Sequence, residues 1–532
     1  EAGGGAARRV RPSQLAGPEM VFSHVHHLRT FRGHRNAVYC SMFDRSGRYV
    51  LTGSDDRLVK VWSAETGLLQ RTCRGHEGDI VDLAVSGDNT TFASACNQCI
   101  IRTWQLAGGV LGQPLVTLLG HTAAVTSLAF CPALPSVLIS GGEDGTLRVW
   151  DARNSAQEPL VLPLARPAPG GGAPAPAQAG KSLMCVAFSP SGEFFAAGSN
   201  APLCVAHVFR LGLEHLVGRG THGRSPPLSH KHVTELRTLD KHNNDICNIH
   251  FSHSNDRILT ASKDGTVKVW RLAEGWRASK KRPHFDLALA MQTLPEVNPE
   301  AAQRRQRRIA PSPPINLAVW SKDDRHVVAA VGTGKLYVWS AETGSLRHVV
   351  EAHHSPAYVV AECPSDPRLV LSAGYDGRLL VVDVALGRVV RAFVVCGTRQ
   401  EREVADDESQ RPWKLVDGQW SPDGLSMVVS DEVGQFSLFG TSDGGSLRRA
   451  KYDQFFKSDF NALIRDQAGN VVDSVTQQAP HLSVNDPLCD ADLEPYPEPY
   501  QSAFQGGRVS LTCPAADFAT PLPMAYVETD VA

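Results

Sequence analysis

A repeated unit constrains the fold of this 532-residue chain more than any other feature of its sequence. Each full copy begins with a residue pair ending in His, continues to an Asp, and ends six residues later at a Trp. The clearest copies are 34–62, 121–150 and 242–270, with His-to-Trp separations of 28, 29 and 28 residues. Such a unit cannot bury both of its faces alone, so the period predicts units that stack against one another.

The residues between each Asp and Trp predict a tight turn followed by a strand. DDRLVKVW, EDGTLRVW and KDGTVKVW each place a turn before alternating apolar and polar side chains. A hydroxyl side chain stands four residues before each Asp, so His, Ser or Thr, Asp and Trp can form one hydrogen-bonded network. Buried His and Asp need such partners, because an unpaired polar group inside a protein costs free energy. The predicted network residues are His34, Thr52, Asp56, Trp62, His76, Ser94, Trp104, His121, Ser140, Asp144, Trp150, His242, Thr260, Asp264, Trp270, Trp339, His353, Ser372 and Asp376.

Weaker copies of the unit follow the same order. Gln98 replaces the Asp in the second copy, Val382 replaces the Trp in the seventh, and the sixth keeps only the strand that ends at Trp339. The fourth and eighth copies keep their middle strands and an SPSG or SPDG turn. These residues resemble the WD40 repeat, and the resemblance implies an all-β propeller with four-stranded blades. We count eight blades, with seven as the alternative.

The repeats also predict the domain organisation. We place the propeller at residues 27–440, after an N-terminal tail at 1–26. Residues 27–31 are expected to form the outer strand of the blade made by 415–439, which closes the ring and removes an open sheet edge. The extension at 441–532 no longer follows the pattern of the repeats. We expect its first part to be packed on the propeller and the rest to be disordered.

Four inserts interrupt the predicted propeller, near 155–180, 211–235, 277–312 and 397–412. The first is a Pro/Gly/Ala linker with too little bulk to pack. The third carries two basic clusters, which are typical of solvated loops but also of a nuclear-import signal or a phosphate-facing patch. These clusters consist of Lys280, Lys281, Arg282, Arg304, Arg305, Arg307 and Arg308.

Composition excludes several classes of protein. Lys and Arg total 53 and Asp and Glu 55, so the net charge of −2 favours neither bulk nucleic-acid nor membrane binding. No run of about 18 apolar residues predicts a membrane-spanning helix. The first residues contain no apolar signal segment and no starting Met, and we expect a soluble piece of a longer chain. The 12 cysteines are spread through apolar segments, which predicts reduced thiols and an intracellular compartment.

No motif in the sequence predicts an enzyme or a cofactor site. Cys96 and Cys99 form a CxxC pair, but no second pair stands at the spacing of a zinc site. The histidines at 24, 26 and 27 are more typical of a solvated tail than of metal ligands. GxSxG, P-loop and dinucleotide motifs are absent from the sequence, and the repeated acids are explained by turns. We therefore predict no catalytic residue, no metal, no cofactor and no small-molecule substrate.

The segment after the repeats is the most specific part of the sequence. Together with TFRGHRNAVYCSMFDRSGR in the first repeat, it resembles the bromodomain and WD-repeat-containing protein family over most of residues 27–485. The resemblance implies a nuclear, chromatin-associated regulator of transcription, with cytoplasmic occurrence as a further option, and some members serve as substrate receptors of cullin-RING ubiquitin ligases. Only 32 residues follow residue 500, too few for a bromodomain's helical bundle, so we expect no bromodomain within this sequence. The short segments of the extension that carry the resemblance lie at 455–456, 458–460, 463–466 and 476–482.

One strand end has a second possible role. Trp150, Asp151 and Arg153 read W-D-x-R, which resembles the box through which WD40 receptors bind the large propeller adaptor of cullin-4 ligases. In structural terms Trp150 closes its blade and the next residues begin a turn. The predicted function is a non-catalytic scaffold for this adaptor and for histones or chromatin-associated proteins. The alternative is a scaffold that binds histone or nucleic acid directly, without a ligase.

Overall fold

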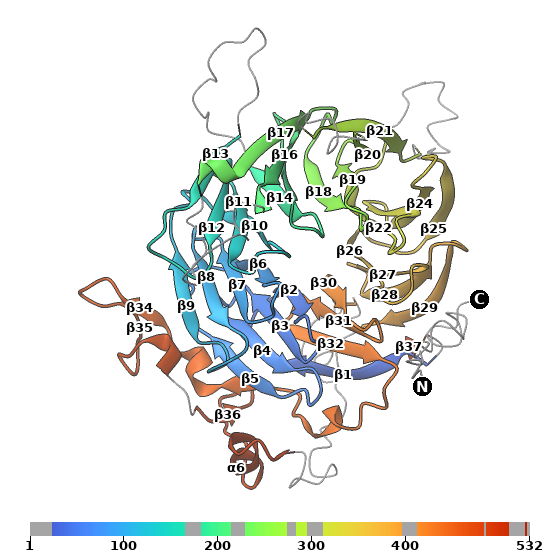
Figure 1. Ribbon diagram of the computed structural model, residues 1–532. Helices are drawn as coiled ribbons and strands as arrows, with labels where there is room; N and C mark the ends of the chain where they lie inside the picture. The colour runs from blue at the N-terminus through green and yellow to red at the C-terminus, as the bar shows by residue number, and fades with distance from the viewer. Residues whose placement is uncertain are drawn as a thin grey trace, which may run out of the picture.

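The computed structural model describes residues 24–164, 182–213, 229–273, 283–294, 312–395, 412–482, 486–509 and 527–528. The strands of the repeats form eight antiparallel sheets arranged as the blades of a ring (Figure 1). Seven of these sheets have four strands, and the seventh blade gains a fifth, β37 (Val527–Glu528). The predicted eight-bladed all-β propeller is therefore confirmed, and the alternative of seven blades is wrong.

The strands of each blade follow one another outward from the ring axis, and the innermost strands of neighbouring blades contact each other. The bounds for the first four blades are β2 (Val38–Phe43), β3 (Tyr49–Ser54), β4 (Val59–Ser63), β5 (Leu69–Cys73); β6 (Ile80–Val85), β7 (Thr91–Cys96), β8 (Ile101–Gln105), β9 (Pro114–Leu118); β10 (Val125–Phe130), β11 (Val137–Gly142), β12 (Thr146–Asp151), β13 (Leu160–Pro163); β14 (Leu183–Phe188), β15 (Phe194–Ser199), β16 (Ala206–Leu211) and β17 (Val233–Leu239).

The last four blades repeat this order. They comprise β18 (Ile246–Phe251), β19 (Arg257–Ser262), β20 (Thr266–Leu272), β21 (Phe285–Gln292); β22 (Ile315–Trp320), β23 (His326–Val331), β24 (Lys335–Ser340), β25 (Leu346–Glu351); β26 (Ala357–Glu362), β27 (Leu369–Gly374), β28 (Arg378–Asp383), β29 (Arg388–Val394); and β30 (Leu415–Trp420), β31 (Ser426–Asp431), β32 (Gln435–Gly440) with β1 (His26–Arg32).

The ring closes through strands from opposite ends of the repeat region. β1 pairs antiparallel with β32, from His26 opposite Gly440 to Arg32 opposite Gln435. Phe31 of β1 is fully buried, and its ring centroid lies 5.3 Å from that of Phe436. The predicted closure is confirmed, and β32 consequently has no open edge.

The core lies between neighbouring blades. The middle strands are buried on both faces, which explains their nearly continuous apolar sequences. Leu259 of the fifth blade and Trp320 and Trp339 of the sixth belong to one buried cluster, and similar clusters join other neighbours. Each blade thus buries a face that it could not bury alone.

Parts of the predicted inserts are outer strands. β13 lies within 155–180, the first residues of β17 lie within 211–235, and β21 lies within 277–312. Outer strands expose many side chains, as the alternating and largely exposed pattern of β21 shows, so they lack the apolar signature of the middle strands. Residues 165–181, 214–228, 274–282, 295–311 and 396–411 lie outside the described residues.

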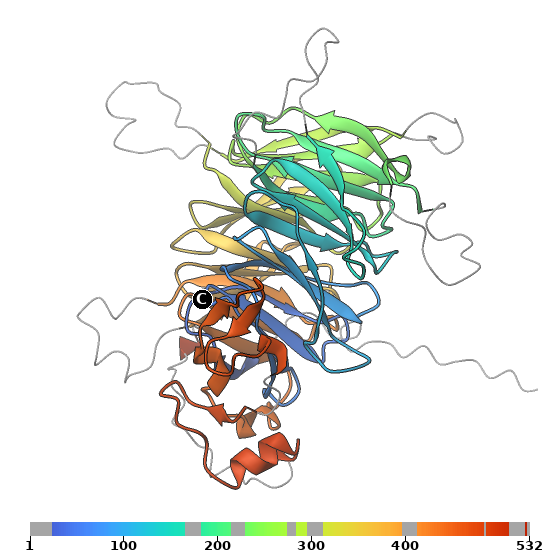
Figure 2. The same ribbon diagram turned by 90° about the vertical axis from the view of Figure 1, so that its left-hand side faces the viewer.

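The extension packs beside the first and second blades (Figures 1 and 2). It contains the 3-10 turns η3 (Leu447–Arg449), η4 (Lys457–Phe460) and η5 (Pro480–Leu482), the strands β33 (Phe455–Phe456), β34 (Leu463–Arg465), β35 (Val471–Asp473) and β36 (Leu488–Cys489), and the helix α6 (Tyr500–Gln505).

The packed part of the extension reaches further than the sequence predicted. β36 pairs with β33, and Tyr500 and Ala503 of α6 join the buried cluster around Trp62. The Pro-rich acidic stretch before α6 has few apolar residues, and its order comes from these contacts with the first blade. The expected disorder after the first part of the extension therefore does not apply to residues 486–509, which contact the first blade.

Candidate functional site

The repeated His, hydroxyl, Asp and Trp residues meet inside the blades. In the first blade His34 lies between Asp56 (Nδ1 to Oδ2, 3.0 Å) and Thr52 (Nε2 to Oγ1, 2.8 Å), and Trp62 Nε1 donates to Thr52 (3.0 Å). The third and fifth blades repeat all these contacts. The seventh blade repeats the two hydrogen bonds of the His, one with the Asp and one with the hydroxyl. Those networks are His121, Ser140, Asp144 and Trp150; His242, Thr260, Asp264 and Trp270; and His353, Ser372 and Asp376.

The Asp residues of these networks remain ionised. Burial alone would raise the pKa of Asp144, but hydrogen bonds from His121, from the Thr122 backbone and from Thr146 outweigh it. The pKa of Asp144 therefore lies below its usual range. Because these groups are buried and satisfied by one another, they stabilise the blades and have no free group for chemistry.

Five of the eight blades lack the full network, among them the second, sixth and seventh. In the second blade His76 Nε2 is hydrogen-bonded to the Ser94 hydroxyl (2.6 Å), and Trp104 Nε1 donates to the same hydroxyl (2.8 Å). Gln98 stands in the place of the Asp and provides no carboxylate. Burial lowers the pKa of His76 to about 3, so this imidazole is neutral. In the sixth blade an Ala stands opposite Tyr337, where the first blade has its Thr, and in the seventh a Val replaces the Trp.

The W-D-x-R segment presents one side chain to solvent. Trp150 is 2% exposed and belongs to the core, and Asp151 Oδ1 accepts the Arg153 backbone N–H (3.1 Å). The Arg153 side chain is 43% exposed, and its Nη2 donates to Asp88 (2.6 Å) and Thr90 (2.9 Å) in the turn of the neighbouring blade. Of the three predicted docking residues, Trp150 is buried in its blade, Asp151 is half-buried and binds the Arg153 backbone N–H, and Arg153 is exposed.

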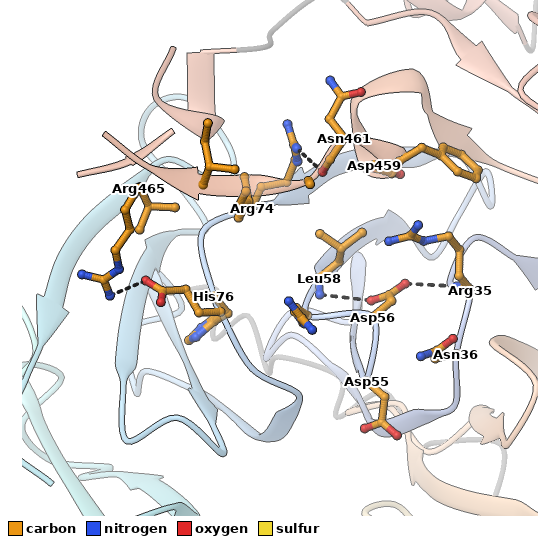
Figure 3. A pocket seen from close by; sticks show the side chains of 17 residues that line it. Arg35, Asn36, Asp55, Asp56, Leu58, Arg74, His76, Asp459, Asn461 and Arg465 are labelled. Atoms are coloured by element: carbon orange, nitrogen blue, oxygen red, sulfur yellow. Dashed lines mark hydrogen bonds and ion pairs between the residues drawn. The ribbon is translucent and has the colours of Figure 1, made fainter. Parts of the chain in front are cut away.

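A pocket of about 600 Å³ lies between the extension and the first two blades (Figure 3). Its propeller wall comes from the turns that precede β2, β4 and β6, and its other wall from η4, β34 and one residue of β35. The pocket was not predicted, because its two walls are some 400 residues apart. The lining residues are Arg35, Asn36, Asp55, Asp56, Arg57, Leu58, Arg74, His76, Glu77, Asp459, Phe460, Asn461, Ala462, Leu463, Ile464, Arg465 and Val471.

Two buried ion pairs hold the extension wall in place. Lys60 Nζ contacts Asp459 Oδ2, and both side chains are fully buried. Arg74 Nη1 lies 2.7 Å from Asp473 Oδ2, and these two side chains are almost fully buried. Arg74 Nη2 also donates to the Asn461 carbonyl (3.0 Å). Removing one partner of such a pair would leave the other charge buried and uncompensated, so each pair makes the docked position of the extension depend on both of its residues.

Two further contacts bridge the walls at the ends of the pocket. The Arg35 guanidinium lies over the Phe460 ring, 5.3 Å from its centroid. At the other end Arg465, labelled in Figure 3, donates from Nη2 to Glu77 Oε1 (2.7 Å). The pocket is thus lined by charged turns on one side and a short β-ribbon on the other.

Two further groups of residues were considered in the sequence, the basic clusters and the potential metal ligands. Lys280, Lys281, Arg282, Arg304, Arg305, Arg307 and Arg308 lie outside the described residues. Within the described part of the chain, no three His, Cys, Asp or Glu side chains are grouped to hold a metal ion, and this includes the CxxC pair and His24, His26 and His27. None of the described helices has the length and apolarity needed to cross a bilayer.

Comparisons with known proteins agree with this architecture. The WD domain, G-beta repeat family matches residues 26–63, 67–105, 112–151, 177–201 and 233–271. The chain is 28% identical to a bromodomain and WD repeat-containing protein of Dictyostelium discoideum over 93% of this chain and 23% of that protein. It is 25% identical to the nuclear distribution protein nudF of Aspergillus niger over 47% of this chain and 62% of the relative. Among solved structures, the computationally designed Ika8 protein has a TM-score of 0.53 at 20% identity, covering 78% of this chain and 99% of its own.

The fold and these matches show an eight-bladed β-propeller that contains WD40 repeats. Its resemblance to the bromodomain and WD repeat-containing family, predicted from the first blade and the extension, is confirmed by the Dictyostelium relative. The chain spans about a quarter of that relative's length. The likeness to the designed protein shows the fold alone.

Proposed function

We propose that this WD40 scaffold brings chromatin-associated proteins to a cullin-4 type ubiquitin ligase in the nucleus, and that Arg153 contacts the ligase adaptor. A WD40 propeller supports protein interaction through the turns on its two faces. The finer role rests on one observation, the exposure of Arg153 at the end of a W-D-x-R segment in which Trp150 and Ala152 are buried.

The geometry around Arg153 supports a docking role. Only Nη2 of its guanidinium is engaged by Asp88 and Thr90, and within the described residues Nε and Nη1 have no partner. Asp88 retains its charge because hydrogen bonds from Ser86, Arg153 and Thr90 outweigh burial and lower its pKa to about 2. A guanidinium oriented in this way can offer its remaining donors to a carboxylate of a partner.

The test is replacement of Arg153 by Ala in the tagged chain, followed by affinity purification from nuclear extract. We expect recovery of the ligase adaptor to fall at least tenfold, while stability changes little because exposed ion pairs contribute about 0–1 kcal/mol. Arg325→Ala is the matched control, since its side chain is 81% exposed and it precedes β23 in a turn equivalent to that of Asp88. Adaptor recovery at the wild-type level with Arg153→Ala would refute the docking role.

A second candidate function is a scaffold that binds histone or nucleic acid without a ligase. The two basic clusters of the 277–312 insert favour it, because clustered Lys and Arg bind phosphates. The same purification separates the two candidates. Recovery of histones or nucleic acid with no adaptor from the wild-type chain would support this second function.

A further inference from the structure

The extension wall of the pocket presents the edge of a β-ribbon. β34 and β35 form a two-stranded sheet, so within the described residues β34 has a strand neighbour on one side only. Five consecutive residues, 461–465, line the pocket, whereas β35 contributes only Val471. The unpaired side of β34 therefore faces the pocket.

The register of the ribbon identifies the main-chain groups at this edge. The Ser474 N–H donates to the Ala462 carbonyl, and the Asp466 N–H donates to the Asn470 carbonyl, both at 2.9 Å. Ile464 lies midway between Ala462 and Asp466, opposite Val472. Because hydrogen-bonded and non-hydrogen-bonded pairs alternate along an antiparallel ribbon, Ile464 and Val472 form a hydrogen-bonded pair. The N–H and C=O groups of Leu463 and Arg465 consequently point away from β35, and an unpaired row of this kind is a template for another strand.

Among the pocket residues that are not already in ion pairs, the positive charges outnumber the negative ones. Four arginines and four acids line the pocket, but most are already paired: Arg74 with Asp473, Arg465 with Glu77, Asp459 with Lys60 and Asp56 with His34.

Arg35 and Arg57 are exposed and have no acidic partner within the described ranges. Among the described residues no cation pairs with Asp55, and in Figure 3 its carboxylate points away from the extension. Two cations therefore remain available beside the free edge of β34.

We propose that the pocket binds an extended acidic segment of a partner protein, which adds to β34 as a third strand and places its carboxylates against Arg35 and Arg57. Main-chain bonds to Leu463 and Arg465 supply affinity that is independent of sequence, and the arginines select acidic side chains. The volume of about 600 Å³ lies within the range of about 300–1,000 Å³ that is usual for ligand sites. This surface is distinct from the Arg153 turn, because it is built from the turns at the opposite ends of the strands.

The first experiment measures binding of a fluorescein-labelled hexapeptide of alternating Glu and Val to the full chain, by fluorescence anisotropy. We expect saturable binding that weakens at least tenfold in the Arg35→Ala/Arg57→Ala double variant. Arg153→Ala and Arg325→Ala are the matched controls and should bind as the wild type does, so failure of this site and failure of the adaptor docking are distinguishable. Equal binding of a Lys and Val hexapeptide, or stronger binding of a single-stranded hexanucleotide, would overturn the proposal.

The second experiment needs no substitution. Hydrogen exchange of the wild-type chain should slow at the Leu463 and Arg465 amides when the Glu and Val peptide is added. The Ile464 amide, already bonded within the ribbon, is the internal control and should change little. Binding that leaves the Leu463 and Arg465 amides unprotected would exclude strand addition.

Discussion

At the scale of single residues, the Trp that closes a blade combines packing with a hydrogen bond. Trp62 is 1% exposed, contacts Phe436 with ring centroids 4.9 Å apart, and donates to Thr52. We expect Trp62→Ala to lower the free energy of unfolding by about 3–5 kcal/mol, because it leaves a cavity between the first and eighth blades. Urea denaturation measures the change, with Tyr358→Ala, at an exposed position, as the control. Unchanged stability of the Trp62 variant would contradict its closing role.

Two carboxyl groups on the innermost strands make stability depend on pH. Asp82 Oδ2 accepts the Leu128 N–H (2.6 Å) and Asp417 Oδ2 accepts the Ser41 N–H (2.7 Å), so each joins two neighbouring blades. Burial raises the pKa of Asp82 to about 7 and that of Asp417 to about 6.

A raised pKa in the folded state means that the neutral form is favoured there. The stabilisation is complete below the ordinary Asp pKa and is lost as the pH rises through about 6 to 7. We therefore expect these groups to lower the melting temperature between pH 5 and pH 8. Asp82→Asn keeps an acceptor for Leu128 and should flatten this slope. A variant with the same slope as the wild type would show that Asp82 does not titrate in this range.

At the scale of structural elements, the extension is attached through charge as well as apolar contact. Asp459→Asn keeps an acceptor for the Phe456 N–H but leaves Lys60 buried without its counter-ion. We expect it to destabilise the docked extension by about 3–5 kcal/mol. Lys60→Met in the same chain should restore most of that loss, because it removes the uncompensated charge. Limited proteolysis between residues 441 and 509 and thermal melting provide the measurements, and additive losses in the double variant would argue against a direct pair.

The elements differ in how far their sequences reveal them. The middle strands and their turns could be predicted, because each strand has alternating or continuous apolar residues and lies next to a typical turn residue. The outer strands β13, β17 and β21 were partly mistaken for inserts, since exposed edge strands carry mixed side chains. β36 and α6 were missed because their order depends on contacts with the first blade.

At the scale of the whole molecule, the propeller is a ring whose first and last strands share one sheet. This closure links the N-terminal strand to the eighth blade, and the extension then returns to the first and second blades. The turn that carries Arg153 and the pocket beside β34 consequently belong to the same ring of blades. A partner on one face and a partner on the other can therefore be held at a constant separation.

The sequence by itself predicted the repeat, the closing strand and most residues of the blade networks, and it left eight or seven blades open. The repeat and its networks could be predicted because they depend on short spacings that recur along the chain, and the closing strand followed from the need of the last blade for an outer strand. The tertiary structure alone decided which charges are buried together, since Lys60 and Asp459, and likewise Arg74 and Asp473, are separated by 399 residues. It also decided that Arg153 is held by a neighbouring blade and that a pocket exists, because both arise from surfaces that meet only after the ring has formed.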